Sequence, residues 1–194
     1  MDIDLIIVAI YSYLLGSIPF GLLLTRIFLK KDIRTVGSGN IGTTNVLRTG
    51  NKFLAITTLA LDLFKGYISV YLTIFYFEDL TSLSALICFI GLIFPIWLRF
   101  KGGKGVATYV GILFAINFYF GIIFAISWFV TFFISKFSSL SSLVGAASIP
   151  IYLLILTQFD QVIFFTIMFV LIFFTHRENI KRLKNKEETK TKIY

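Results

Sequence analysis

Histidine and cysteine are nearly absent from this sequence of 194 residues, because each occurs once, as His176 and Cys88. A single cysteine excludes an internal disulfide bond and a cluster of thiolate metal ligands. A single histidine leaves any metal site to carboxylates, and these do not cluster along the chain. We therefore expect no metal and no other cofactor.

Charged residues are also scarce, at 14%, whereas 57% of the residues are hydrophobic and the mean hydropathy is +0.89. A soluble domain of this length could not bury so much apolar surface, so the solvent must largely be lipid. The formal net charge of +8 would suggest nucleic acid as the partner of a soluble protein. Here it is explained by the tendency of Lys and Arg to collect in cytoplasmic loops. We expect an all-α membrane protein that binds no nucleic acid.

The number of membrane crossings depends on the second half of the chain. Three spans are expected at about residues 3–24, 53–75 and 80–98, each long enough for the hydrocarbon core. Residues 106–175 are almost continuously apolar. Weak interruptions at Asn117, at 135–139 and at 157–161 would divide them into four spans, for seven in all. Without the interruptions, two unusually long helices would give five.

The charges favour seven spans over five. With the N-terminus outside, acidic residues mark the outer ends, and every cation except Lys65 falls on the cytoplasmic side. A five-span chain would place Lys136 outside, against the positive-inside rule. We expect one membrane domain over residues 1–194, with the C-terminus inside. Its cytoplasmic parts are loops at about 25–52, 99–105 and 135–142 and a tail at 176–194.

Glycines and polar residues are concentrated in one cytoplasmic segment, residues 37–48, which reads GSGNIGTTNVLR. Gly37, Gly39 and Gly42 would let successive backbone N–H groups turn inward as an anion-binding nest. Neutral donors are added by Ser38, Asn40, Thr43 and Asn45. Arg48 supplies a forked cation suited to phosphate. The plainer alternative is a flexible loop with ordinary turn residues.

A second glycine-rich segment, residues 99–108, reads RFKGGKGVAT. It does not match the nucleotide-binding pattern G-x-x-x-x-G-K-[ST], because Gly105 follows Lys104. Gly102, Gly103 and Gly105 would still free the backbone, and a helix starting near Val106 would point its positive end at the loop. The alternative is a cytoplasmic anchor, which explains Arg99 and Lys101 but needs no glycines.

Three further features have two readings each. Asp62 and Lys65 share a helix face at membrane depth, where they form either a structural ion pair or part of the wall of a site. Ser141 and Ser142 belong to a serine run that caps a helix or contacts a ligand. His176 is an interfacial side chain or a functional one. Two phosphate-type loops without a nucleophile or a histidine relay indicate group transfer from an activated substrate, catalysed by positioning and charge.

In this order and spacing, the motifs resemble the bacterial membrane acyl-phosphate:glycerol-3-phosphate acyltransferases, the PlsY family. They are GSIPxG at 16–21, GSGNIGxTNxxR at 37–48, DxxKG at 62–66, FKGGKGVAT at 100–108, SLSS at 139–142 and HRxNIxRL at 176–183. The resemblance implies a seven-helix bundle in the bacterial cytoplasmic membrane with its site facing the cytoplasm. It also implies transfer of a fatty acyl group from acyl-phosphate to the sn-1 hydroxyl of glycerol 3-phosphate, without a metal, by an enzyme that we expect to be a monomer among membrane lipids.

The resemblance assigns roles by position. Gly37, Ser38, Asn40 and Asn45 would hold the acyl-phosphate headgroup, and Gly102, Gly103 and Gly105 would shape the pocket. Glycerol 3-phosphate would be held by Arg48, Lys104, Ser141, Ser142, His176 and Asn179. We predict catalytic roles for Ser38, Arg48, Lys104, His176 and Asn179. We predict substrate contact for the other residues named in this paragraph and also for Gly39, Gly42, Thr43 and Lys65.

The chain departs from the family pattern at three places. Leu92 stands where a histidine is usual, Lys136 where an arginine is common, and no glycine occurs near Asn185 and Lys186, which leaves the partner of Glu187 or Glu188 open. A transporter of small anions or phosphate esters is the alternative function. It should carry matching polar breaks on the outer side, and the sequence has none. The His-x-x-x-x-Asp acyltransferase motif is absent, because Lys181 follows His176 at that spacing.

Overall fold

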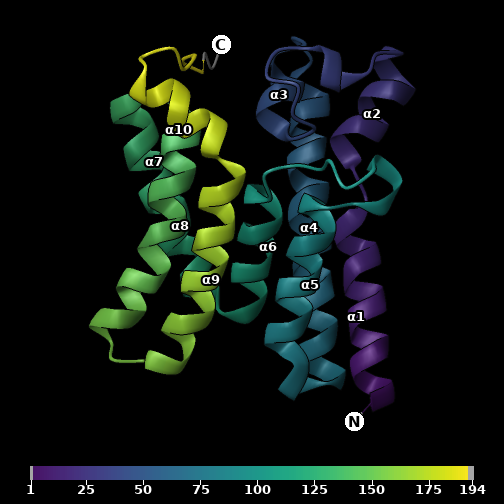
Figure 1. Ribbon diagram of the computed structural model, residues 1–194, viewed down its shortest axis with the longest axis vertical. Coiled ribbons are helices and arrows are strands. Elements are labelled where there is room, and N and C mark those ends of the chain that lie inside the picture. Colours follow the sequence, from purple (N-terminus) through teal and green to yellow (C-terminus); the bar gives the residue numbers. More distant parts are fainter. Residues whose placement is uncertain (1, 192–194) are drawn as a thin grey trace. The chain divides into compact units, whose positions relative to one another are not determined.

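The computed structural model describes residues 2–191, so residue 1 and residues 192–194 of the predicted domain lie outside the described part. Every regular element in that part is helical, which confirms the all-α class (Figure 1). The chain divides into two compact units, Met1–Ile116 and Asn117–Tyr194, and each is described by itself.

The first unit contains six α-helices and three short 3-10 turns within its described residues. In chain order they are α1 (Asp2–Ser17), α2 (Phe20–Leu29), η1 (Ile33–Thr35), α3 (Thr43–Leu47), α4 (Lys52–Tyr76), η2 (Glu78–Leu80), α5 (Thr81–Ile93), η3 (Ile96–Leu98) and α6 (Val106–Ile116). Pro19 stands between α1 and α2, because proline cannot donate the amide hydrogen that a continuous helix needs.

Glycines set the close helix pairs of this unit, in which α1 packs on α5 and α4 on α6. A Cβ atom on Gly16 would lie 1.9 Å from the carbonyl oxygen of Cys88 in α5. One on Gly111 would lie 2.0 Å from the carbonyl oxygen of Leu63 in α4. Only residues without a side chain allow backbones to approach so closely, as in other membrane helix pairs.

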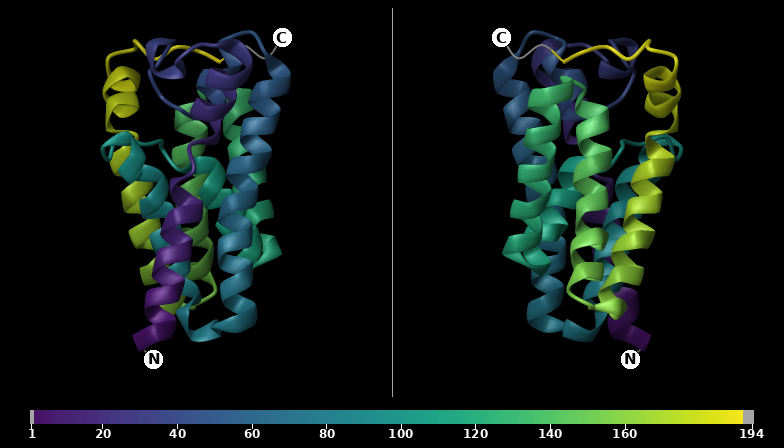
Figure 2. Two further views of the ribbon diagram at one scale, coloured as in Figure 1. Left: turned by 90° about the vertical axis from the view of Figure 1, so that its right-hand side faces the viewer. Right: turned by 90° about the vertical axis from the view of Figure 1, so that its left-hand side faces the viewer.

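The second unit consists of α7 (Phe118–Ser135), α8 (Ser138–Ile155), α9 (Phe159–Thr175) and α10 (Arg177–Lys184). α8 packs on α7 and on α9, and the three run side by side in Figures 1 and 2. α10 bends away from α9 by 63° at His176. The helices end at the three interruptions that the sequence predicts, and the Asn117 side chain caps α7 by accepting a hydrogen bond from the Tyr119 amide at 2.9 Å.

Five segments of the described chain are long and apolar enough to cross a membrane, and six if α9 and α10 count as one bent span. They are Ile3–Leu29, Lys52–Tyr76, Glu78–Leu98, Phe118–Ser135 and Ser138–Ile155. α6 has 11 residues and is shorter than the usual spanning length. The protein therefore crosses the membrane several times.

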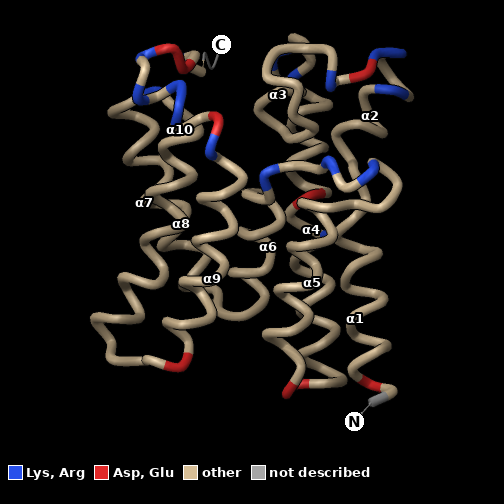
Figure 3. The backbone as a smooth tube through the Cα atoms, viewed as in Figure 1, with Lys and Arg blue, Asp and Glu red and all other residues tan. Residues whose placement is uncertain are grey.

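Charges are separated along the helices of each unit (Figure 3). In the first unit, Lys and Arg gather at the end that carries α2 and α3, whereas the turn between α4 and α5 is acidic. In the second unit, cations gather on α10, and Asp160 lies in the first turn of α9. This is the asymmetry that the positive-inside rule requires.

Candidate active site

Asn45 is the centre of the glycine-rich loop at residues 37–48. Its side chain is 2% exposed, and its amide nitrogen donates to the carbonyl oxygens of Ile33, Val36 and Asn40 at 3.0, 2.9 and 2.7 Å. Its side-chain oxygen accepts from the backbone amide of Ser38 at 3.0 Å. One buried amide thus ties the start of the loop to the helix that closes it, so Asn45 acts as a scaffold for its neighbours.

The predicted anion nest is wrong in part. The Ser38 amide donates to Asn45, the Gly39 amide to the Val36 carbonyl at 3.0 Å, and the Gly42 amide to the Asn40 side-chain oxygen at 3.1 Å. Two of these three N–H groups therefore bond to asparagine side chains and the third bonds to a backbone carbonyl, so none of them points to an anion. Ser38 stays exposed on this framework, at the edge of the loop.

Arg48 and Thr43 are two further predicted contact residues of this loop, one exposed and the other with a buried hydroxyl. Gly37 has φ +56°, and a Cβ there would lie 2.8 Å from Cδ of Arg48, so the glycine gives the arginine stem its place. Arg48 is exposed beyond it. The Thr43 hydroxyl is buried and has no hydrogen-bond partner among the described residues. A buried hydroxyl without a partner is costly, which suits one that completes its bonding with a substrate.

The second glycine-rich loop is fastened to α5. The amides of Gly102 and Gly103 donate to the carbonyl oxygens of Ile93 and Leu92 at 3.0 and 3.1 Å. A Cβ on Gly102 would lie 2.0 Å from the Leu92 oxygen, so this glycine serves close approach and its backbone is not free for an anion. Gly105 adopts φ +88°, packs against the Phe89 ring and turns the chain into α6. Lys104 is half-buried and lies between Gly103 and Gly105, whose positions are fixed by these contacts.

Lys65 lies in the interior of the first unit and is 1% exposed. Its ammonium group is 2.7 Å from the Asp62 carboxylate and donates to the Ile18 carbonyl oxygen at 2.7 Å. It therefore joins α4 to the break between α1 and α2. The structural ion pair, one of the two alternatives for Asp62 and Lys65, is therefore present in the structure. Substrate contact by Lys65 stays a prediction.

Serines 141 and 142 lie in the first turns of α8 and are almost fully buried. Their hydroxyls donate back to the carbonyl oxygens of Phe137 and Ser138, each at 2.8 Å. The Ser142 hydroxyl also accepts from the indole nitrogen of Trp128 in α7 at 3.2 Å. The sequence gives no sign of this partner, because one tryptophan in an apolar span is indistinguishable from packing.

His176 stands at the bend between α9 and α10 and is 2% exposed. Its Nδ1 lies 2.8 Å from the Ile172 carbonyl oxygen, which can only accept a hydrogen bond. Nδ1 therefore carries a proton, and Nε2 is the basic nitrogen of the neutral ring.

Asn179 is held by the carboxylate of Glu188. Its amide nitrogen donates to Oε1 of Glu188 at 2.6 Å, where the Ser139 hydroxyl also donates at 2.7 Å, and Nε of Arg182 donates to Oε2 at 2.7 Å. Burial opposes ionisation of this carboxylate, but the three donors outweigh it and hold the pKa of Glu188 below its usual value. The Asn179 side-chain oxygen is buried and accepts no hydrogen bond from another described residue. Glu188 therefore fixes the orientation of the amide through its nitrogen, and the oxygen stays available as an acceptor.

The predicted site residues are divided between the two units. The first unit contains the two glycine-rich loops with Ser38, Arg48 and Lys104, and the second contains Ser141, Ser142, His176 and Asn179. In each unit one buried side chain orients predicted contact residues, Asn45 in the first and Glu188 in the second. The described residues contain no group of acidic, histidine or cysteine side chains that could bind a metal.

Comparison with known proteins gives a consistent result over nearly the whole chain. The family model for glycerol-3-phosphate acyltransferase matches residues 6–186. A glycerol-3-phosphate acyltransferase of Pelagibacter ubique is 64% identical over 98% of this chain and 100% of that protein. One of Mesorhizobium japonicum is 46% identical over 94% of each chain.

A solved structure is similar as well. The crystal structure of PlsY (YgiH), an integral membrane glycerol 3-phosphate acyltransferase, in its glycerol 3-phosphate form has a TM-score of 0.91 and 31% identity. The match covers 96% of this chain and 95% of that one. The lysophosphatidic acid form of the same protein has a TM-score of 0.88.

Proposed function

The chain belongs to the glycerol-3-phosphate acyltransferase family, and on this premise we propose that it takes its acyl group from an acyl-phosphate. The acceptor is the sn-1 hydroxyl of glycerol 3-phosphate, and the products are lysophosphatidic acid and phosphate. The observation that carries the proposal furthest is the similarity, over 96% of the chain, to the glycerol 3-phosphate form of PlsY. Both substrates are phosphate esters or anhydrides, which suits two cationic loops and no metal cluster among the described residues.

The reaction needs positioning more than covalent chemistry, because phosphate is a competent leaving group. The glycerol hydroxyl attacks the acyl carbonyl carbon, the carbon–oxygen bond to phosphate breaks, and the hydroxyl proton passes to a phosphate oxygen of the substrate. Gly37, Ser38, Asn40 and Asn45 would hold the acyl-phosphate headgroup. Glycerol 3-phosphate would be held by Arg48, Lys104, Ser141, Ser142, His176 and Asn179, with Gly102, Gly103 and Gly105 shaping the pocket.

His176 is the alternative to the substrate phosphate as the group that accepts the proton of the glycerol hydroxyl. Its Nδ1–H is committed to the Ile172 carbonyl, so Nε2 is the nitrogen that would accept the proton. His176→Gln tests the choice. Near-normal turnover at saturating substrate would leave the proton to the substrate phosphate, and a turnover loss of about 10²-fold or more would assign it to the histidine.

The membrane arrangement is also proposed. We propose seven crossings, with α6 as a short one, the N-terminus outside, and both loops and α10 on the cytoplasmic side of the cytoplasmic membrane. The charge separation in each unit supports this orientation. The enzyme works as a monomer.

The function is tested with purified protein in detergent, given glycerol 3-phosphate and one acyl donor at a time. We expect acylation with palmitoyl-phosphate and none with palmitoyl-CoA or an acyl carrier protein thioester. Equal use of the CoA ester would overturn the donor assignment and leave the family assignment intact. Arg48→Gln serves as the control for a site-dependent reaction and should lose activity with every donor.

A further inference from the structure

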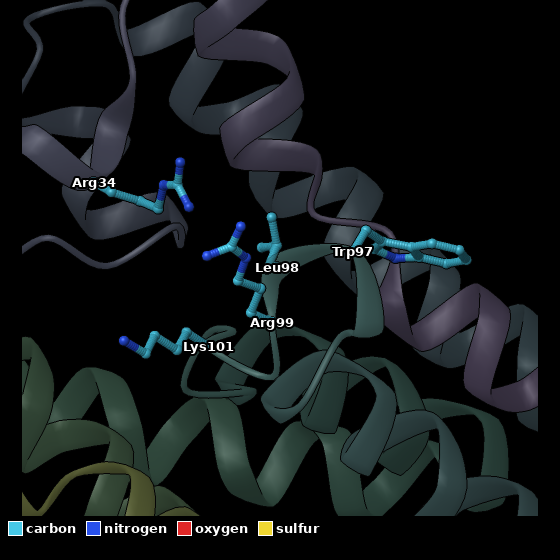
Figure 4. Close-up of a pocket in the computed structure, with 5 residues that line it drawn as sticks. All are labelled: Arg34, Trp97, Leu98, Arg99 and Lys101. Carbon is cyan, nitrogen blue, oxygen red and sulfur yellow. The ribbon is translucent and has the colours of Figure 1, made fainter.

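A pocket of about 370 Å³ opens within the first unit beside the second glycine-rich loop, and none of its lining residues is among those given roles above. It is lined by Arg34, Trp97, Leu98, Arg99 and Lys101 (Figure 4). The Arg34 and Arg99 guanidinium groups point toward each other across it. The last four of these residues belong to the segment 94–103 that leaves α5, here called the strap.

The charge around the pocket is strongly positive. The Asp32 carboxylate accepts hydrogen bonds from Arg34, a lining residue, and from Arg26, at 2.6 and 2.7 Å. The hydrogen bond from Arg34 has the larger effect and the one from Arg26 the smaller, and together they hold the pKa of Asp32 well below its usual range. The carboxylate therefore stays ionised. The Asp32 carboxylate cancels one of the two positive charges of Arg26 and Arg34, which leaves one positive charge. Arg99 and Lys101 add two more positive charges. No hydrogen bond or ion pair joins the side chains of Arg99 and Lys101 to another described residue.

The strap is built in a strained conformation that presents these cations. Arg99 and Phe100 have φ +52° and +61°, a left-handed region that is unfavourable for residues with side chains. Backbone bonds from the Arg99 amide to Ile96 and from the Phe100 amide to Pro95, at 3.1 and 3.0 Å, hold it in this form. The Trp97 indole nitrogen adds a bond to the Ser17 carbonyl oxygen at 2.9 Å. Strain of this kind persists where the surrounding structure enforces it, often at binding sites.

The other side chains of the strap indicate where the ligand comes from. Ile96, Trp97 and Phe100 are 55%, 54% and 58% exposed, and they neighbour Arg99 and Lys101 in the sequence. Tryptophan and other large apolar side chains beside Lys and Arg are typical of the level of lipid headgroups. A free anion would need only the charges, whereas a lipid uses both the charges and the apolar surface.

We propose that this pocket binds the phosphate group of an anionic membrane phospholipid. The guanidinium groups of Arg34 and Arg99 hold two phosphate oxygens, and Lys101 adds a third charge. The acyl chains lie against Ile96, Trp97 and Phe100. The lining residues have no assigned role in acyl transfer, so the test of this proposal can fail without affecting the proposed function.

The test uses Trp97 as the reporter in full-length protein that carries Trp128→Phe, which leaves one tryptophan. The protein is placed in vesicles of unlabelled lipid with a fixed fraction of brominated phosphatidylglycerol or brominated phosphatidylcholine. Bromine quenches nearby indole fluorescence. We expect the phosphatidylglycerol to quench Trp97 at least about threefold more effectively at equal fraction.

Two double variants carry the same charge change. Arg99→Gln/Lys101→Gln should lose the preference for phosphatidylglycerol. Lys30→Gln/Lys31→Gln, at exposed positions outside the pocket, should keep it. Equal quenching by both lipids in the parent overturns the proposal, as does a preference that survives in the first variant or disappears in both. If inorganic phosphate at millimolar concentration abolishes the preference, the pocket binds free phosphate and the lipid assignment is wrong.

Discussion

Asn45 and Lys65 illustrate how single buried polar residues organise this protein. Each was predicted from its motif to contact substrate, and in each the polar atoms of the side chain contact partners within the protein. An amide can donate and accept at once, which lets Asn45 hold three carbonyls and an amide that would otherwise be left without partners. Each therefore positions the residues beside it, and direct contact of either with substrate stays a prediction.

Asn45→Asp tests the scaffold role at the residue scale. The carboxylate keeps the shape of the side chain but cannot donate to the carbonyls of Ile33, Val36 and Asn40, and each lost bond costs about 1–3 kcal/mol. We expect a clear fall in thermal stability, measured as Tm in detergent. Asn51→Asp is the matched control, because an aspartate can accept the same capping bond from the Leu54 amide. An unchanged Tm for Asn45→Asp would contradict the scaffold role.

Lys186 is the second residue with a testable conformation. It adopts φ +60° at the end of α10, a conformation that favours glycine. The left-handed region costs about 1–2 kcal/mol for lysine, more than the about 0.5–1 kcal/mol of extra chain entropy that glycine loses. Lys186→Gly should therefore raise Tm slightly. Lys181→Gly, inside α10, should lower it, and a lower Tm for both would show that residue 186 is not strained.

Glu188 acts at the scale of elements, because it joins the start of α8, α10 and the tail. Its side chain is 7% exposed and accepts from Ser139, Asn179 and Arg182. Through Asn179 it orients a predicted substrate contact. The sequence left the partner open, since a glutamate nine residues beyond Asn179 has no fixed place until the chain turns at Lys186.

The ionised form of Glu188 makes a pH-dependent contribution to stability. Its pKa is lowered by folding, so the contribution is complete above the ordinary value of 4.5 and is lost as the pH falls through the lowered pKa. Glu188→Gln should be less stable than the parent at pH 7 by about 1–2 kcal/mol, and the gap in Tm should narrow below pH 4.5. Glu187→Gln, at an exposed neighbour, should match the parent throughout. A gap that widens in acid would contradict this account.

The elements were more predictable from sequence than the contacts at the site. Asn117 and the serine run after Lys136 are local signals, and the helices break at both. The fate of the Gly102 and Gly103 amides was not predictable, because it depends on carbonyls at the end of α5 that the loop meets only after folding. The same holds for Trp128, whose bond to Ser142 joins two helices of an apolar stretch.

At the scale of the whole molecule, the proposed seven crossings can be separated from five by one residue. In a Cys88→Ala background, which has no other cysteine, Lys136→Cys is exposed to a membrane-impermeant maleimide on intact cells. Seven crossings place residue 136 inside, so labelling should require permeabilised membranes. Glu78→Cys should be labelled on intact cells as the outer control. Labelling of residue 136 from outside would contradict the proposed arrangement.

The central claim is direct transfer of an acyl group from acyl-phosphate to glycerol 3-phosphate, and its most direct measurement is the stoichiometry of that reaction. Purified protein in lipid vesicles is given palmitoyl-phosphate and glycerol 3-phosphate, and phosphate and lysophosphatidic acid are followed together. The account predicts one phosphate released for each 1-acyl product, and neither product when glycerol 3-phosphate is omitted. Phosphate release without an acylated product would contradict it.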